Sequence, residues 1–184
     1  MDETQELLPS SSQSHASVKV YRTRWYILIV YAANVILQSV AMLVYQAVPT
    51  TVTEEVYPEA DLSDNDLNLI LSIGSLSFLV FILFMFVVDG LTTSLRTVTV
   101  ISAVSLLIHC IIRLIPHWIT SLKKNAFVFM LLSQLLNEFG CAFSYSLPTR
   151  VSATWFPTRE RAVVTGVASQ ISSAGCAFSF LVVP

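Results

Sequence analysis

Charged residues are scarce in this chain of 184 residues. Asp, Glu, Lys and Arg together make up 12% of it, whereas hydrophobic residues make up 54%. With a mean hydropathy of +0.70, a water-soluble domain of this size would lack the polar surface needed to cover itself. The formal net charge of -2 also excludes the strongly basic balance of a nucleic-acid-binding protein. The composition therefore predicts an integral membrane protein.

Residues that would form a reactive centre are equally sparse. The three cysteines lie inside apolar segments, where cysteine is expected to pack as a small side chain, and they define neither a disulfide framework nor a metal site. No Ser/His/Asp, His-Glu-x-x-His or clustered-carboxylate arrangement of the kind used by enzymes is present. We therefore expect no catalytic residue, metal or cofactor, and an enzyme is the least favoured class.

Five apolar runs have the length of membrane spans, because about 20 helical residues cross the hydrocarbon core. They run from Trp25 to Val48, Leu67 to Val88, Val98 to Ile115, Ala126 to Leu147 and Ala162 to Val183. Polar and acidic side chains between Leu62 and Asp66 are expected to cap the first turn of the second helix. The predicted fold class is all-α, a polytopic membrane helix bundle over residues 21–184.

Basic residues are distributed unequally between the connecting segments. Placing the N-terminus in the cytosol leaves seven of them on the inner side, and the other three, Arg113, Lys123 and Lys124, on the outer side. The segment from Thr50 to Asp66 carries six acidic residues and no basic one. This bias predicts a cytosolic N-terminus.

The first 20 residues are polar, rich in serine and without apolar periodicity, so we expect a disordered cytosolic tail at residues 1–20. Within it, Glu3, Leu7 and Leu8 fit the acidic dileucine pattern that sorting adaptors read to send membrane proteins to lysosomes. The tail therefore predicts adaptor binding, and a lysosomal membrane is favoured over the plasma membrane.

Polar or aromatic side chains gather on one face of the first and fourth predicted helices, and both faces should point to a common interior. They comprise Tyr31, Asn34, Gln38, Ala41 and Tyr45 on the first, and Gln134, Asn137, Glu138, Cys141 and Tyr145 on the fourth. The predicted substrate pathway is lined by Asn34, Gln38, Tyr45, Gln134, Asn137, Glu138 and, on the fifth helix, Gln170. The alternative for the amides is hydrogen bonding between helices without a cavity.

Glu138 is the most costly of these residues, because a carboxylate near the bilayer centre costs about 2.5–3.5 kcal/mol unless it is paired, hydrated or protonated. Either it carries a coupling proton or cation, or it makes a structural hydrogen bond to a neighbouring helix. His109 and Arg113 lie one turn apart on the third predicted helix. His109 is either a sensor of pH or a hydrogen-bonded interior residue, and Arg113 is expected to snorkel to the outer surface.

A charged turn lies between the fourth and fifth apolar runs. Pro148 and Pro157 bracket it, and we expect a short surface loop here, with the fifth helix beginning near Thr158, because charges cannot lie cheaply inside the bilayer. Alternation of the spans places on one cytosolic side a predicted gating charge cluster of Asp89, Arg96, Arg150, Arg159, Glu160 and Arg161.

Trp155-Phe156-Pro157 is followed by Glu160-Arg161-Ala162, while Asp89 ends the second helix and Arg96 opens the third. Together these residues resemble the N-terminal half of a major facilitator transporter. In that family a Gly-x-x-x-Asp-Arg/Lys-x-Gly-Arg signature joins helices 2 and 3. Its acidic residue pairs with arginines near helices 4 and 5. Asp89 and Arg96 match it in role, whereas Met85 replaces the leading glycine.

A narrower resemblance covers nearly the whole chain after the tail. It rests on four segments: Val20-Tyr21-Arg22-Thr23-Arg24-Trp25, Gln134-x-x-Asn137, Thr154-Trp155-Phe156 and Phe180-Leu181-Val182-Val183-Pro184. These segments resemble solute carrier family 49. That family includes the feline leukaemia virus subgroup C receptor type and the disrupted in renal carcinoma type. This resemblance implies transport of a small organic solute such as pyridoxine, choline or heme-related cargo. Met42 stands where the family has a substrate-packing tryptophan, which argues against choline-type recognition.

Major facilitator transporters are built of two halves of six helices each. The resemblance therefore implies that this chain provides five spans of the first half and is an incomplete transporter. The rival class is a non-transporting membrane scaffold or regulatory partner. Small residues are dense in the fifth predicted helix, and the close helix packing that they permit would serve either class.

Overall fold

The computed structural model describes residues 22–89 and 94–182, and every regular element within these ranges is helical. The long helices are α1 (Thr23–Ala47), α2 (Asp64–Asp89), α3 (Leu95–Trp118), α4 (Ala126–Tyr145) and α6 (Thr158–Val182), and the shorter α5 (Leu147–Trp155) continues α4. Three short helical segments, Thr51–Val56, Pro58–Ala60 and Thr120–Asn125, complete the connections. Five stretches are long and apolar enough to cross a membrane, with α4 and α5 contributing to one of them. The prediction of an all-α polytopic bundle is confirmed.

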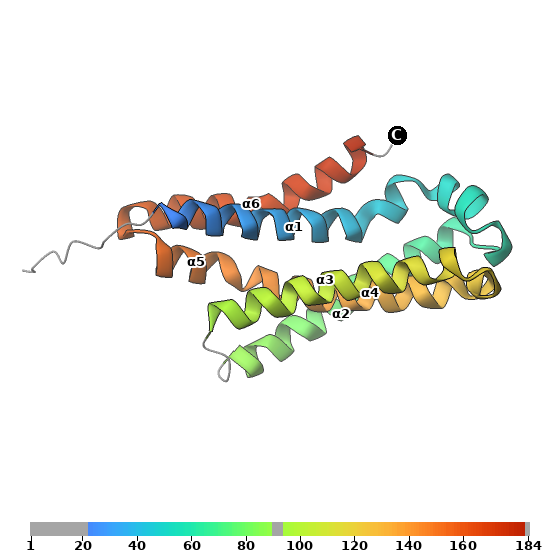
Figure 1. Cartoon of the computed structure of the whole chain (residues 1–184), viewed down its shortest axis with the longest axis horizontal. Coiled ribbons are helices and arrows are strands. Elements are labelled where there is room, and N and C mark those ends of the chain that lie inside the picture. The colour runs from blue at the N-terminus through green and yellow to red at the C-terminus, as the bar shows by residue number, and fades with distance from the viewer. Residues whose placement is uncertain (1–21, 90–93, 183–184) are drawn as a thin grey trace, which may run out of the picture.

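The helices form two layers joined by α5 (Figure 1). In one layer α1 packs lengthwise against α6, and in the other α4 packs against both α2 and α3. Helix α4 also contacts α1, and α5 contacts α6. Helix α4, through its contact with α1, and helix α5, through its contact with α6, therefore both hold the two layers together.

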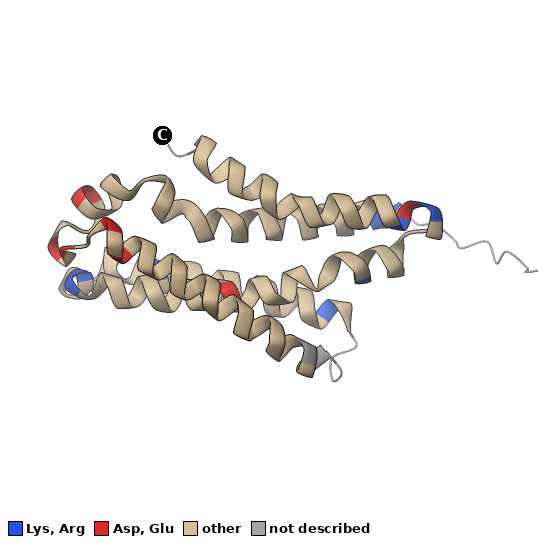
Figure 2. Cartoon of the chain, turned by 180° about the vertical axis from the view of Figure 1, so that it is seen from behind, with Lys and Arg blue, Asp and Glu red and all other residues tan. Residues whose placement is uncertain are grey.

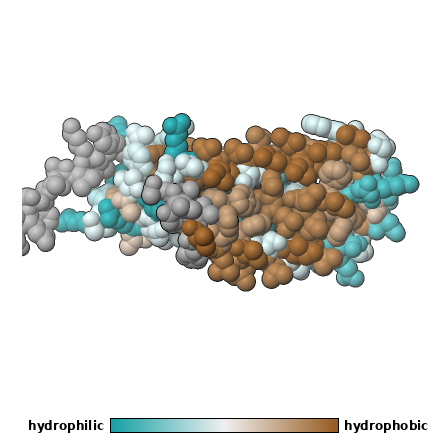
Figure 3. All heavy atoms as spheres, turned by 90° about the horizontal axis from the view of Figure 1, so that it is seen from below, coloured by the Kyte–Doolittle hydropathy of each residue, from teal (hydrophilic) through white to brown (hydrophobic). Residues whose placement is uncertain are grey.

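The charges lie mainly at the two ends of the bundle (Figure 2). At the end that we call the acidic end, the described residues include Glu54, Glu55, Glu59, Asp61, Asp64 and Asp66, with Lys123 and Lys124. The opposite end, where α1 and α6 begin, carries arginines, and we call it the arginine end. On the face seen in Figure 3 the surface between the ends is apolar. Exposed Leu79, Leu83, Leu107 and Val163 are suited to contact lipid.

The structure corrects the predicted surface loop between Pro148 and Pro157. The chain departs from α4 at Ser146 but resumes as α5, so only Phe156 and Pro157 separate α5 from α6. Pro148 lies in the first turn of α5, where its missing N–H is not needed. Phe156 is extended, as expected for a residue before proline, and this ends the helix. The sixth helix begins at Thr158, which agrees with the predicted start.

The start of α2 is capped as the sequence indicates. Asp66 N–H donates to Ser63 Oγ at 3.3 Å, and the Asp66 carboxylate accepts hydrogen bonds from Ser63 N–H at 2.9 Å and from Ser63 Oγ at 2.7 Å. This reciprocal arrangement satisfies backbone groups at the helix N-terminus that have no partner within the helix.

We predict that Gly175→Ala destabilises the bundle by about 1–3 kcal/mol, because a Cβ at Gly175 would lie 2.8 Å from Ser39 Cβ and 3.0 Å from Ile36 Cα on α1. Gly166→Ala on the same helix is the matched control, since a Cβ there meets nothing within 4 Å. Thermal unfolding of both variants in detergent should show a loss for the first and none for the second. Equal stability of the two variants would contradict the close packing of α6 on α1.

Candidate functional site

A closed network of polar side chains joins α1, α3 and α4. Asn34 Nδ2 donates to Ser102 Oγ at 2.7 Å and lies 3.3 Å from Ser144 Oγ, while Gln38 Nε2 donates to Ser102 Oγ at 3.2 Å. Ser144 Oγ donates to Gln38 Oε1 at 2.6 Å, and the two serine hydroxyls are 2.6 Å apart. Because the Ser144 proton is used on Gln38, Ser102 must donate to Ser144. Two of the predicted pathway residues thus hold three helices together.

Asn137 and Gly140 bring α4 close to this network. Asn137 Nδ2 donates to the Gln38 carbonyl at 3.2 Å, and the Asn137 side chain is fully buried. A Cβ at Gly140 would lie 2.8 Å from Gln38 Nε2 and 3.0 Å from Ser105 Cβ. The absence of a side chain at Gly140 is therefore what allows α4 to approach α1 and α3 so closely.

Glu138 and Gln134 form a buried pair within α4. Gln134 Nε2 donates to Glu138 Oε1 at 2.9 Å, and their side chains are 1% and 2% exposed, respectively. Gln134 also packs on α2 at Gly74, where a Cβ would lie 2.9 Å from Gln134 Cγ. Glu138 therefore makes this hydrogen bond within its own helix. The structural interpretation of Glu138 from the sequence predicted a hydrogen bond to a neighbouring helix.

Tyr45 lies apart from the network, beneath Arg113 at the acidic end. The Arg113 guanidinium carbon is 3.5 Å from the centroid of the Tyr45 ring, and Arg113 Nη1 donates to the Ala41 carbonyl at 3.1 Å. Arg113 therefore turns inward onto α1 and does not snorkel, because the aromatic face and the carbonyl together stabilise the cation. Tyr57 OH donates to the Arg113 carbonyl at 3.3 Å, and burial raises the pKa of Tyr57, which keeps this donor protonated.

His109 is buried between α3 and α4, with its side chain 1% exposed. Its Nδ1 lies 2.7 Å from the Ser133 carbonyl, which can only accept, so Nδ1 carries the proton. Within the part of the chain that the structure describes, Nε2 has no hydrogen-bond partner. His109 is thus a hydrogen-bonded interior residue, in line with one of the two alternatives from the sequence.

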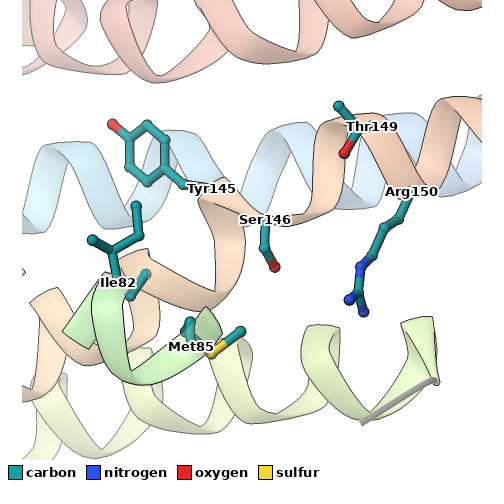
Figure 4. A pocket seen from close by; sticks show the side chains of 7 residues that line it. Ile82, Met85, Tyr145, Ser146, Thr149 and Arg150 are labelled. Atoms are coloured by element: carbon teal, nitrogen blue, oxygen red, sulfur yellow. The ribbon is translucent and has the colours of Figure 1, made fainter. Parts of the chain in front are cut away.

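Two pockets flank the point where the chain passes from α4 to α5. The larger, of about 260 Å³, lies between α2 and the α4–α5 segment (Figure 4) and is lined by Ile82, Met85, Ala142, Tyr145, Ser146, Thr149 and Arg150. The smaller, of about 130 Å³, lies between α1, α4, α5 and α6 and is lined by Tyr31, Val35, Ser144, Tyr145, Pro148, Ala168, Ser169 and Ser172. Tyr145 belongs to both pockets, is 51% exposed and stacks edge-on against Phe78 at 5.4 Å.

The predicted pathway residues are not among the described residues that line either pocket. Asn34 and Gln38 lie in the polar network of α1, α3 and α4, Asn137 bonds to the Gln38 carbonyl beside it, and Gln170 is on the exposed side of α6. The sequence prediction missed Tyr145, although it lies on the polar face of the fourth helix. The signal that could have found it is its position just before Pro148, where a membrane helix is interrupted.

The predicted gating residues are distributed around the arginine end. Glu160 pairs with Arg24 at 2.9 Å, a partner that the sequence prediction did not include. Arg161 Nε donates to the Phe156 carbonyl at 3.0 Å, and Arg161, Arg159 and Arg96 are all exposed. Arg150 lines the larger pocket and extends from α5 on the side where Met85 lies (Figure 4). The side chain of Asp89 lies outside the described residues.

These features define a multi-pass helical membrane protein whose polar side chains gather inside the bundle. No family model matches the chain. It is 26% identical over 166 residues to the Solute carrier family 49 member 4 homolog of Xenopus tropicalis. The matched region covers 90% of this chain and 34% of that relative. The same-named protein of Xenopus laevis is 26% identical over 168 residues, 91% of this chain and 35% of the relative. The chain spans about a third of the length of these curated relatives. The resemblance to this solute carrier family is confirmed.

We predict that Ser144→Ala destabilises the bundle by about 1 kcal/mol, because it removes a hydroxyl that bonds Gln38 and leaves buried groups without a partner. Ser102→Ala should act on the same network, so the double variant should lose less than the sum of the single losses. Ser173→Ala, at an exposed position of α6, is the control. Additive losses for Ser102 and Ser144 in detergent unfolding would show that the two hydroxyls are not coupled.

Proposed function

We propose that this chain forms part of a transporter of small organic solutes, of the major facilitator type. The observation that carries the proposal is the similarity to solute carrier relatives over 90% of the chain. The pockets on either side of Tyr145 support a location for the solute pathway, because they are formed where a membrane-spanning segment is interrupted. Interrupted helices within a membrane are tolerated where they are buried in protein or line a cavity.

The size of the pockets supports a pathway shared with further helices. Sites for small molecules commonly enclose about 300–1,000 Å³. The two pockets, of about 260 and 130 Å³, are smaller than this range, and Tyr145 between them is half-exposed. We infer that the solute is enclosed only when protein surface beyond the described helices covers Tyr145, as expected for a transporter of two helical halves.

The charge cluster at the arginine end is proposed to lock the helices on the cytosolic side during transport. The Arg24–Glu160 ion pair supports this role, because it ties the beginnings of α1 and α6. The lock would also include Asp89 with Arg150 or Arg161, as the family resemblance implies. A half-buried pair of this kind matters more than an exposed one, since removing one partner leaves the other charge uncompensated.

We predict that Tyr145→Ala lowers solute uptake at least about tenfold, since the truncation merges the two pockets and removes the aromatic surface that both share. Phe178→Ala is the matched control, because Phe178 is also 51% exposed and lines neither pocket. Uptake is measured in vesicles containing the naturally expressed full-length protein. Unchanged uptake by Tyr145→Ala at equal expression would place the pathway elsewhere.

Glu138 is proposed to carry a coupling proton, and its burial with Gln134 as a hydrogen-bond donor supports a carboxyl group that changes charge during transport. Glu138→Gln should abolish the stimulation of uptake by a pH gradient, since an amide cannot bind the proton. Glu138→Asp should retain part of it. The measurement is uptake with and without an imposed gradient, and stimulation that survives Glu138→Gln would assign the proton to another group.

Residence in the lysosomal membrane is a further part of the proposal. It rests on Glu3, Leu7 and Leu8, which lie outside the described residues and would bind sorting adaptors. Imaging of a variant with Leu7 and Leu8 replaced by Ala tests it, because an unchanged location would remove the sorting role.

The alternative function, a non-transporting scaffold or regulatory partner, is supported by the exposed small residues of α6. Gly166, Ser169, Ser173 and Ala177 are exposed along this helix, and such small residues permit close contact with another helix. A full-length protein that associates stably with another membrane protein and moves no solute in vesicles would favour this alternative.

A further inference from the structure

A compact group of arginines lies at the beginning of α1 and α6 (Figure 2). We call it the arginine patch, and it consists of Arg22, Arg24, Arg159 and Arg161. Glu160 is the acidic side chain within it and is paired with Arg24 at 2.9 Å. The patch therefore retains a strongly positive charge. Its position at one end of a membrane bundle places this charge where a bilayer has its headgroups.

The centre of the patch is held rigidly by aromatic side chains. The Arg24 guanidinium lies 5.4 Å from the ring centroid of Trp25 and 5.3 Å from that of Phe156. The two rings are themselves 5.5 Å apart and stacked edge to face. Arg161 Nε donates to the Phe156 carbonyl at 3.0 Å, so Phe156 orients two arginines at once. A cation held in this way loses little conformational freedom when it binds an anion.

Two further arginines flank this centre. Arg22 and Arg159 are exposed, and each is next to the rigid centre, one at the start of α1 and the other in the first turn of α6. Exposed guanidinium groups suit bidentate hydrogen bonding to phosphate or carboxylate oxygens. The patch thus combines a preorganised centre with two accessible cationic arms.

The surface beside the patch is apolar. Trp25 is 49% exposed and Tyr26 is 68% exposed, and amphipathic rings of this kind lie at the headgroup level of membranes. One to two turns further along, α1 exposes Ile29 and α6 exposes Val163 and Val167. A ligand that satisfies this whole surface needs an anionic head and an apolar tail.

We propose that the arginine patch binds the headgroup of an anionic phospholipid, with the acyl chains lying along the exposed apolar residues of α1 and α6. An acidic peptide would match the charge but would leave the apolar surface beside Trp25 unmatched. The acidic end, with its aspartates and glutamates, repels the same lipids. The bound lipid belongs to the leaflet facing the arginine end, and the proposal requires no assumption about the solute.

The test measures lipid retention by the full-length protein extracted from vesicles of phosphatidylcholine containing about a quarter phosphatidylserine. Native mass spectrometry should show phosphatidylserine enriched over phosphatidylcholine. Replacing Arg22 and Arg159 by Gln should lower the enrichment by up to about fivefold for each arginine. These two side chains are chosen because they are exposed, so their replacement is expected to leave folding unaffected. Thermal unfolding of the variant checks this.

The matched control replaces Lys123 and Lys124 at the acidic end by Gln, which removes the same charge and should leave the enrichment unchanged. Equal retention of the two lipids by the unmodified protein would overturn the proposal. So would an enrichment that the Arg22 and Arg159 replacements do not lower. If a polyglutamate peptide binds the patch and needs these arginines while phosphatidylserine retention does not, the partner is an acidic protein and the lipid proposal is wrong.

Discussion

The structure depends on the lack of water inside a bilayer, which strongly favours hydrogen bonds between polar groups within the bundle. The contact between the Ser102 and Ser144 hydroxyls, 2.6 Å apart, is where this constraint is met most fully. Asn34 and Gln38 reach it from α1, so each amide is satisfied by two other helices. In hydrocarbon, where no hydrophobic effect drives helices together, such a network adds to close packing in determining which helices are neighbours.

Helix α4 is central because it serves both the network and the pockets. Its buried length carries Asn137, Gly140 and Ser144, which require tight packing. One residue beyond Ser144, Tyr145 is half-exposed and lies between two pockets, whereas Leu147 and Val151 on α5 are buried again. The interruption at Ser146 is stable because its N–H and hydroxyl both donate to the Phe143 carbonyl, at 3.2 and 2.7 Å. Tightly packed residues and pocket-lining residues therefore adjoin within a single membrane span.

The ends of the bundle differ in how they hold their cations. At the acidic end Arg113 turns inward over Tyr45, and the Tyr57 hydroxyl binds the Arg113 carbonyl. At the arginine end Arg24 lies beside the rings of Trp25 and Phe156 and pairs with Glu160, with further arginines exposed around it. The first arrangement buries its cation between helices, whereas the second leaves positive charge exposed at one end of the bundle.

The sequence alone predicts the class of fold, because the length and apolarity of five runs and the capping residues before α2 are local properties. It also marked the polar faces of the first and fourth helices, since helical periodicity requires no knowledge of neighbours. Only the folded chain shows that Asn34 and Gln38 bond to Ser102 and Ser144, and that Arg24 is the partner of Glu160. The two pockets beside Tyr145 are likewise visible only in the folded chain. These outcomes depend on which helices meet and at what height, and a pattern along one helix carries no information about the helix that faces it.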